Sequence, residues 1–195
     1  MTNESGTAGG DYINANYVDV RTNRLITKPV FYLKYGPKKK SQIGTLKYIC
    51  TQAPLHNTVE DFHRMIWETK SRVIVMLTKN IEDGNVKAYE YLPKIETNPN
   101  DEKLDEEDKQ QKFGEILVKS ESFTYSNDKS YTITTFTQTK NGETRQIIRY
   151  QFLEWADNKV PETSKLLELI EKTNEEANNS PDTPIVIHCR QAKEI

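Results

Sequence analysis

A histidine and a cysteine stand side by side near the end of this sequence, at His188 and Cys189. A cysteine thiolate is a strong nucleophile, and nearby hydrogen-bond donors or positive charge favour the thiolate over the neutral thiol. A single free cysteine is nevertheless most often a small buried side chain of a protein core. The pair therefore has two interpretations, core packing and a catalytic thiol, and the surrounding elements bear on which one holds.

The residues before this pair predict a buried strand. Residues 185–187 form a short apolar run, which Pro184 precedes, and such a run between a breaker and polar residues is typical of a sheet interior. Open α/β sheets bind their ligands at the carboxyl ends of their strands. We therefore expect Cys189 at the ligand-binding end of a sheet, which favours the catalytic interpretation.

The first half of the chain predicts two strands and a helix to support this site. Residues 47–52 read as a short strand, and the continuous apolar run at 73–77 as a strand buried on both faces in the middle of the sheet. Between them, Thr58 and Asp61 resemble a capping box. The helix that follows has apolar residues at helical spacing, namely Val59, Phe62, Ile66 and Trp67.

The second half predicts antiparallel strands and a second helix. Segments 131–137 and 145–152 are rich in threonine and aromatic residues and flank Asn141-Gly142, a strong hairpin signal. Thr163 or Ser164 can cap a helix. Its predicted apolar stripe is Leu166, Leu167, Leu169 and Ile170.

The order of these elements predicts an α/β (mixed α+β) fold, with a mixed twisted sheet flanked by helices, in one domain over residues 11–195. Residues 1–10 are small and polar and read as a disordered tail. Residues 97–112 carry a block of acidic charge that repels itself, so a flexible surface loop is expected there.

The composition excludes some classes of function. A net charge of −2 gives no overall electrostatic reason to bind nucleic acid or an anionic membrane. No stretch has the length and apolarity of a transmembrane helix or signal peptide. Two cysteines are too few for a disulfide framework and fit a reducing, cytoplasmic compartment. With 35% hydrophobic and 29% charged residues, we expect marginal stability.

Six blocks of this sequence resemble, in order, the signature blocks of the classical protein tyrosine phosphatase domain. Together they span nearly the whole chain after Gly10. The short, divergent sequence is also similar to the tyrosine phosphatases carried by viruses of parasitoid wasps, which would place it in a host cell. The blocks are DYINA at 11–15, YICTQAPLHNTVEDF at 48–62, MIWE at 65–68, SRVIVMLT at 71–78, WAD at 155–157 and PIVIHC at 184–189.

The resemblance implies hydrolysis of phosphotyrosine proteins without a metal or cofactor. Cys189 matches the nucleophile, and Asp157 matches the general acid that protonates the departing phenolate. His188 matches the histidine that helps to hold the phosphate-binding loop. Arg190 follows the cysteine and adds positive charge to the substrate site. The other histidines, His56 and His63, lie around the first helix and are expected to be ordinary, partly exposed side chains.

The sequence departs from the family pattern at residues that would take part in the reaction. The family has an arginine six residues after the cysteine, where this chain has Ile195, and a glycine where it has Glu194. Arg190 and Lys193 supply charge but not the bidentate geometry of that arginine. Ala156 replaces the proline of the general-acid loop. The resemblance also implies a domain truncated at both ends and incomplete after the cysteine.

Three interpretations of function follow from these departures. The chain is a phosphatase by descent with lost or severely impaired turnover, which is the interpretation that we favour. Alternatively, it is a pseudophosphatase, a binding module that shields phosphotyrosine proteins. In the third interpretation the end of the sequence is mis-predicted, and an active enzyme continues past Ile195 with a working loop.

Overall fold

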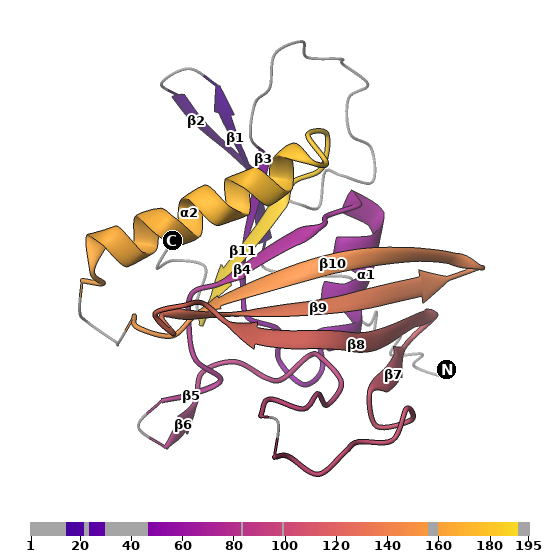
Figure 1. The fold of residues 1–195 in the computed structure, drawn as a ribbon. Coiled ribbons are helices and arrows are strands. Elements are labelled where there is room, and N and C mark those ends of the chain that lie inside the picture. Colours follow the sequence, from indigo (N-terminus) through magenta and orange to yellow (C-terminus); the bar gives the residue numbers. More distant parts are fainter. Residues whose placement is uncertain are drawn as a thin grey trace, which may run out of the picture.

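The structure is a computed structural model that describes residues 15–21, 24–29, 47–82, 84–98, 100–155 and 160–190. The predicted tail at 1–10 lies outside these residues. Within them, nine strands form one mixed sheet in the order β2-β1-β3-β11-β4-β10-β9-β8-β7 (Figure 1). The strands are β1 (Ala15–Arg21), β2 (Arg24–Pro29), β3 (Lys47–Gln52), β4 (Val73–Met76), β7 (Gln110–Phe113), β8 (Ile116–Tyr125), β9 (Tyr131–Lys140), β10 (Glu143–Phe152) and β11 (Ile185–Cys189).

The last strand in the sequence lies in the interior of the sheet. β11 pairs in parallel with β3 on one side and with β4 on the other, and β4 pairs in parallel with β10. The remaining pairs of this sheet are antiparallel. The predicted mixed sheet and the predicted interior strands at 73–77 and 185–187 are confirmed. β3, β4 and β11 therefore end at the same edge of the sheet.

The two helices cover opposite faces of the sheet, as Figure 1 shows. α1 (Val59–Thr69) packs against Ile74 and Val186, whereas α2 (Thr163–Asn178) packs against Val73 and Ile185. Neighbouring residues of a strand point to opposite faces, so this alternation assigns each helix to one face. All four residues of β4 are buried, as expected for a strand covered on both faces.

The helix beginnings differ from the predicted caps. Thr58 is the N-cap of α1, but its side chain makes no capping bond and accepts the backbone N–H of Leu55 at 2.9 Å. Asp61 pairs with Arg64 at 2.7 Å. The predicted capping box is therefore wrong, because both side chains have other partners nearby. α2 begins after Glu162, and Thr163 is its first residue.

The buried stripe of α2 also differs from the prediction. Its buried residues are Leu169, Thr173 and Ala177, which recur every four residues. Leu167 and Ile170 are 52% and 43% exposed, so half of the predicted stripe is wrong. Four leucine and isoleucine residues within five positions cannot all face one neighbour, because a helix turns about 100° per residue.

The predicted hairpin is confirmed. Lys140 pairs with Glu143, and the two residues between them, Asn141 and Gly142, have φ angles of 52° and 78°. Positive φ at both central residues is the requirement of a type I′ turn, which matches the twist of the strands. A smaller hairpin of β5 (Ile81–Glu82) and β6 (Asn85–Val86) lies outside the main sheet.

The acidic segment 97–112 is partly structured, contrary to the prediction of a loop. Its last residues enter β7, which pairs with β8 at the edge of the sheet. Lys109 pairs with Glu96 at 3.0 Å, and Lys119 pairs with Glu106 at 2.8 Å. Lys119 of β8 thus offsets the charge of a carboxylate in the segment, while Lys109 ties the segment to the preceding residues. These ion pairs allow the acidic segment to lie against the sheet.

Candidate active site

Cys189 ends β11 at the edge where β3 and β4 also end. Its backbone carbonyl accepts the N–H of Ala53 at 2.6 Å, and the carbonyl of His188 accepts the N–H of Leu77 at 2.8 Å. Segments that leave β3 and β4 therefore hold the end of β11 from both sides. Cys189 is 6% exposed, and Arg190 after it is exposed.

His188 is fully buried and contacts Tyr91. Its Nε2 lies 2.9 Å from the hydroxyl of Tyr91, and its ring lies edge-on to Phe62. Burial lowers the pKa of His188 to about 3, and the positive charge of Arg149 acts in the same direction. His188 is therefore a neutral imidazole at physiological pH, and it brings no positive charge to Cys189.

Tyr91 is a residue that the sequence analysis did not single out. Its ring is fully buried, and burial raises the pKa of its hydroxyl far above the usual range. It therefore stays a neutral phenol. The segment around Tyr91 lies in no predicted helix or strand. No local pattern could predict its contact with His188, because the two residues are 97 positions apart.

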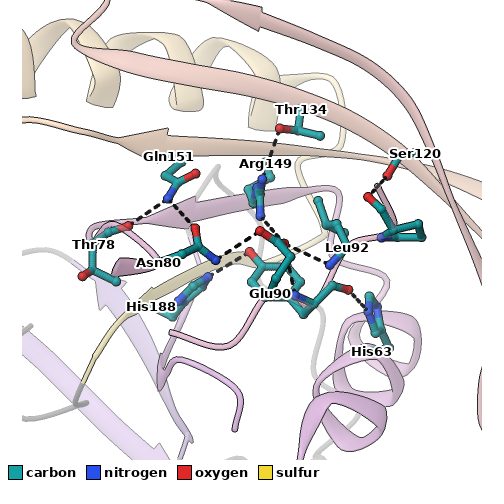
Figure 2. Close-up of polar contacts among 12 residues, drawn as sticks. His63, Thr78, Asn80, Glu90, Leu92, Ser120, Thr134, Arg149, Gln151 and His188 are labelled. Atoms are coloured by element: carbon teal, nitrogen blue, oxygen red, sulfur yellow. Dashed lines mark hydrogen bonds and ion pairs between the residues drawn. The ribbon is translucent and has the colours of Figure 1, made fainter. Parts of the chain in front are cut away.

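An ion pair between the buried Arg149 and the half-exposed Glu90 lies next to Tyr91. Arg149 on β10 is 5% exposed, and its Nη1 donates to Oε1 of Glu90 at 3.1 Å. The same carboxylate oxygen accepts the backbone N–H groups of Tyr91 and Leu92, each at 3.1 Å. Figure 2 shows Glu90 at the centre of these contacts. The pair was not predicted, although a charged residue among the apolar residues of the predicted strand at 145–152 was a signal for it.

The polar contacts continue from Glu90 toward the end of β4. Asn80 donates its Nδ2 to Oε2 of Glu90 at 3.1 Å and accepts from Nε2 of Gln151 at 3.0 Å. Gln151 also donates to the carbonyl of Thr78 at 3.1 Å (Figure 2). These bonds join the chain after β4 to β10, and so stabilise the edge at which β11 ends.

His63 is fully buried, which corrects the prediction of a partly exposed side chain. Its Nε2 donates to the carbonyl of Tyr91 at 2.8 Å, and its Nδ1 accepts from Nε2 of Gln138 at 2.9 Å. Its ring stacks on Phe113 at 4.5 Å between ring centroids. Burial lowers the pKa of His63 to about 4. Both ring nitrogens have partners, so the neutral ring is well accommodated.

The remaining predicted site residue, Asp157, lies outside the described residues, as does Ile195. The second cysteine, Cys50, lies on β3 beside Ile187, and burial raises the pKa of its thiol. Within the described part of the chain, no three His, Cys, Asp or Glu side chains are grouped as a metal site would require. None of the described helices has the length and apolarity needed to cross a membrane.

The sequence and the structure both match known proteins. Residues 2–191 match the family described as Protein-tyrosine phosphatase. The chain belongs to the protein-tyrosine phosphatase family. The match covers Cys189 and Asp157, and the similarity to wasp-virus enzymes stays a prediction.

Two relatives illustrate how far this phosphatase domain has diverged. The chain is 34% identical to "Receptor-type tyrosine-protein phosphatase F" of Danio rerio over 197 residues, which is 97% of this chain and 8% of that protein. It is 30% identical to "Tyrosine-protein phosphatase 1" of Dictyostelium discoideum over 195 residues, 93% of this chain and 31% of that protein. The chain therefore spans less than a third of either relative.

Solved phosphatase structures have the same fold. A structure of "PTPN18 in complex with HER2-pY1196 phosphor-peptides" superposes with a TM-score of 0.63 and 25% identity, over 74% of this chain and 46% of that one. A second structure of PTPN18, with a HER2-pY1248 phosphopeptide, has a TM-score of 0.62. The predicted family and fold class are thus confirmed.

Proposed function

We propose that this chain is a protein tyrosine phosphatase by descent, with Cys189 at the position of the nucleophile and with lost or severely impaired turnover on phosphotyrosine proteins. The observation that carries the proposal is the place of Cys189 at the carboxyl end of the interior strand β11. Ligands of open α/β sheets bind at such an edge. The cysteines Cys50 and Cys189, too few for a disulfide framework, support a reducing, cytoplasmic location.

The reaction of a complete site has two steps. The Cys189 thiolate attacks phosphorus, so that an S–P bond forms while the P–O bond to the tyrosine breaks, and Asp157 gives its proton to the departing phenolate oxygen. Water then attacks the phosphocysteine, releasing inorganic phosphate and restoring the thiolate. Both steps place negative charge on the phosphoryl oxygens, which donors of the phosphate-binding loop must stabilise.

The loop sequence supports impaired turnover. Ile195 stands where the family has the arginine that binds two phosphoryl oxygens, and a hydrocarbon side chain offers no donor. Glu194 adds a carboxylate to a site for a doubly charged phosphate. Removal of one preorganised donor at a comparable site costs about 10²–10³ in kcat. Arg190 is exposed and does not replace a bidentate guanidinium at another position.

A second candidate function is binding without hydrolysis. The solved relatives are described in complex with phosphopeptides, which supports phosphotyrosine peptides as the ligand class for this fold. A pseudophosphatase of this kind would shield phosphotyrosine proteins from other enzymes. Binding of a phosphotyrosine peptide by the chain, with no binding of the unphosphorylated peptide, is the result that would favour it over a degenerate enzyme.

Hydrolysis of a phosphotyrosine peptide tests the proposal. We expect the chain to release no more phosphate than its Cys189→Ser variant. The double variant Glu194→Gly/Ile195→Arg restores the two family residues and is expected to raise the rate, with Cys189→Ser added to it as the control. Turnover of the unaltered chain within tenfold of a family member assayed beside it would refute impaired activity. Sequencing the transcript past the codon for Ile195 tests the alternative that a working loop follows.

A further inference from the structure

The charge of Arg149 is costly for the fold, because a buried charge loses its hydration. Arg149 is 5% exposed, whereas the side chain of its partner Glu90 is 52% exposed. The Arg149 guanidinium donates to Oε1 of Glu90 at 3.1 Å and to the hydroxyl of Thr134 at 3.4 Å, and its Nε has no partner among the described residues. An apolar side chain in place of Arg149 would avoid this desolvation cost, so stability alone does not account for the arginine.

Glu90 holds the backbone on which Tyr91 stands. One carboxylate oxygen accepts the consecutive N–H groups of Tyr91 and Leu92 at 3.1 Å each, and it also receives Arg149. The other oxygen accepts Nδ2 of Asn80 at 3.1 Å. Four contacts to one carboxylate restrict the position of the Tyr91 ring, and therefore the direction in which its hydroxyl points.

Arg149 determines the direction of the hydrogen bond between Tyr91 and His188. Its guanidinium carbon lies 5.4 Å from the centroid of the Tyr91 ring, and the two side chains interact electrostatically. A guanidinium has donors only, so the phenol oxygen is turned toward it and the phenol hydrogen away from it. The hydrogen therefore points at Nε2 of His188, 2.9 Å away. An Nε2 that accepts leaves the proton of the neutral ring on Nδ1, which is buried and has no hydrogen-bond partner among the described residues. This tautomer therefore depends on the bond from Tyr91 to Nε2.

The other groups around His188 do not determine which of its ring nitrogens carries the proton. Cys189 follows on the same strand, and His63 on α1 is a neutral ring bound to the carbonyl of Tyr91. The adjacent strands place Thr51 and Met76 beside His188, and neither titrates. Among the described residues around His188, Arg149 is thus the charged side chain that acts on the ring.

We propose that Arg149 and Glu90 are a positioning pair for the active site, which keeps His188 neutral with its proton on Nδ1 and so fixes the residue before Cys189. The proposal rests on the proposed function only in taking Cys189 as the nucleophile. Neither residue touches the reacting atoms. Their effect reaches the thiol through Tyr91 and His188, which join β10, the segment after β6 and β11.

The experiment is nitrogen NMR of the full chain with ¹⁵N-labelled histidine. In the unaltered chain, we expect the His188 resonances of a protonated Nδ1 and an unprotonated Nε2. In Arg149→Gln we expect these resonances to shift toward a mixture of tautomers, whereas Arg149→Lys, which keeps the charge, should retain the original pattern. Arg145→Gln is the matched control, since Arg145 forms an ion pair with Glu143 on the same strand.

Two results would overturn the proposal: a proton on Nε2 in the unaltered chain, or an unchanged tautomer in a folded Arg149→Gln variant. If Arg149→Gln does not fold, Arg149→Met provides the same comparison, because its unbranched apolar side chain fills the space while the charge is gone. The NMR result does not require turnover. A chain without phosphatase activity can therefore still confirm the pair, and an active chain can still refute it.

Discussion

The backbone carbonyl of Tyr91 accepts a hydrogen bond from His63 at 2.8 Å, while the hydroxyl of the same tyrosine bonds to His188 at 2.9 Å. Two fully buried histidines, one on α1 and one on β11, thus hold one residue at both ends. Protonation of His63 at Nδ1 would break its bond from Gln138, and a positive charge on either ring would lie in a fully buried site. This relationship makes the stability of the domain sensitive to acid.

We predict that the free energy of unfolding decreases as the pH falls from about 6.5 to 5. Folding lowers the pKa of His63 to about 4 and that of His188 to about 3, from an ordinary value of 6.5. In this range the unfolded chain binds protons that the folded chain does not. The contribution of the two neutral histidines to the free energy of unfolding is therefore complete above pH 6.5. It decreases on acidification by about 1.4 kcal/mol per pH unit for each histidine.

Urea unfolding at several pH values measures this dependence. In the variant His63→Gln, the amide donates to the carbonyl of Tyr91 and accepts from Gln138 but does not titrate, so the slope should fall by about half. Carboxylates contribute mostly below this range, as Asp128 does with a pKa lowered to about 2 by hydrogen bonds from Ser130 and Ser126. Stability that is constant between pH 7 and 5 would contradict the prediction.

Removal of the Tyr91 hydroxyl should destabilise the domain. The variant Tyr91→Phe leaves Nε2 of the fully buried His188 without a partner, and an unsatisfied buried polar atom costs about 1–3 kcal/mol. Tyr131→Phe is the control, because the Tyr131 hydroxyl bonds to Glu168, whose side chain stays accessible to water. Equilibrium unfolding should show the larger loss for Tyr91→Phe. Equal losses of unfolding free energy in the two variants would mean that the bond to His188 stabilises the domain no more than a bond at the surface.

Alkylation by iodoacetamide should show whether Cys189 is activated. Glu194 and the loop sequence after Cys189 give little support to a thiolate, and Cys189 is 6% exposed, so we expect little reaction of Cys189 at neutral pH. Burial raises the pKa of Cys50, which should therefore also react mainly at alkaline pH. Mass spectrometry of the alkylated peptides measures both. A half-maximal pH for Cys189 well below 7 would show a functioning anion-binding loop and would favour the binding module.

Two leucines of α2 provide a test of its orientation. Leu169 is 1% exposed in the core beneath the helix, and Leu167 is 52% exposed. Truncation of a buried leucine to alanine costs about 2–5 kcal/mol, so Leu169→Ala should lower the midpoint of thermal unfolding strongly. Leu167→Ala should change stability by less than about 0.5 kcal/mol. The reverse order would mean that the helix is rotated about its axis.

Local patterns in the sequence predicted the frame of the active site. The run at 185–187, the run at 73–77 and the Asn141-Gly142 turn each lie within a few residues, and the periods of strands and turns are properties of such short segments. The same patterns placed Cys189 at the end of an interior strand. The family resemblance predicted Cys189, His188 and Asp157 as site residues, and their roles stay predictions.

Tertiary structure alone decided which polar residues surround the site. His63 was expected to be partly exposed, yet it is buried because Tyr91 and Gln138, 28 and 75 residues away, satisfy its ring. Glu90 and Arg149 are 59 residues apart, and the pairing of β4 with β10 brings the chain that follows β4 close to Arg149. A polar side chain is buried only where distant partners replace its water. The order of the strands in the sheet brings these distant partners together, and the periodic pattern of a single segment cannot predict which partners meet.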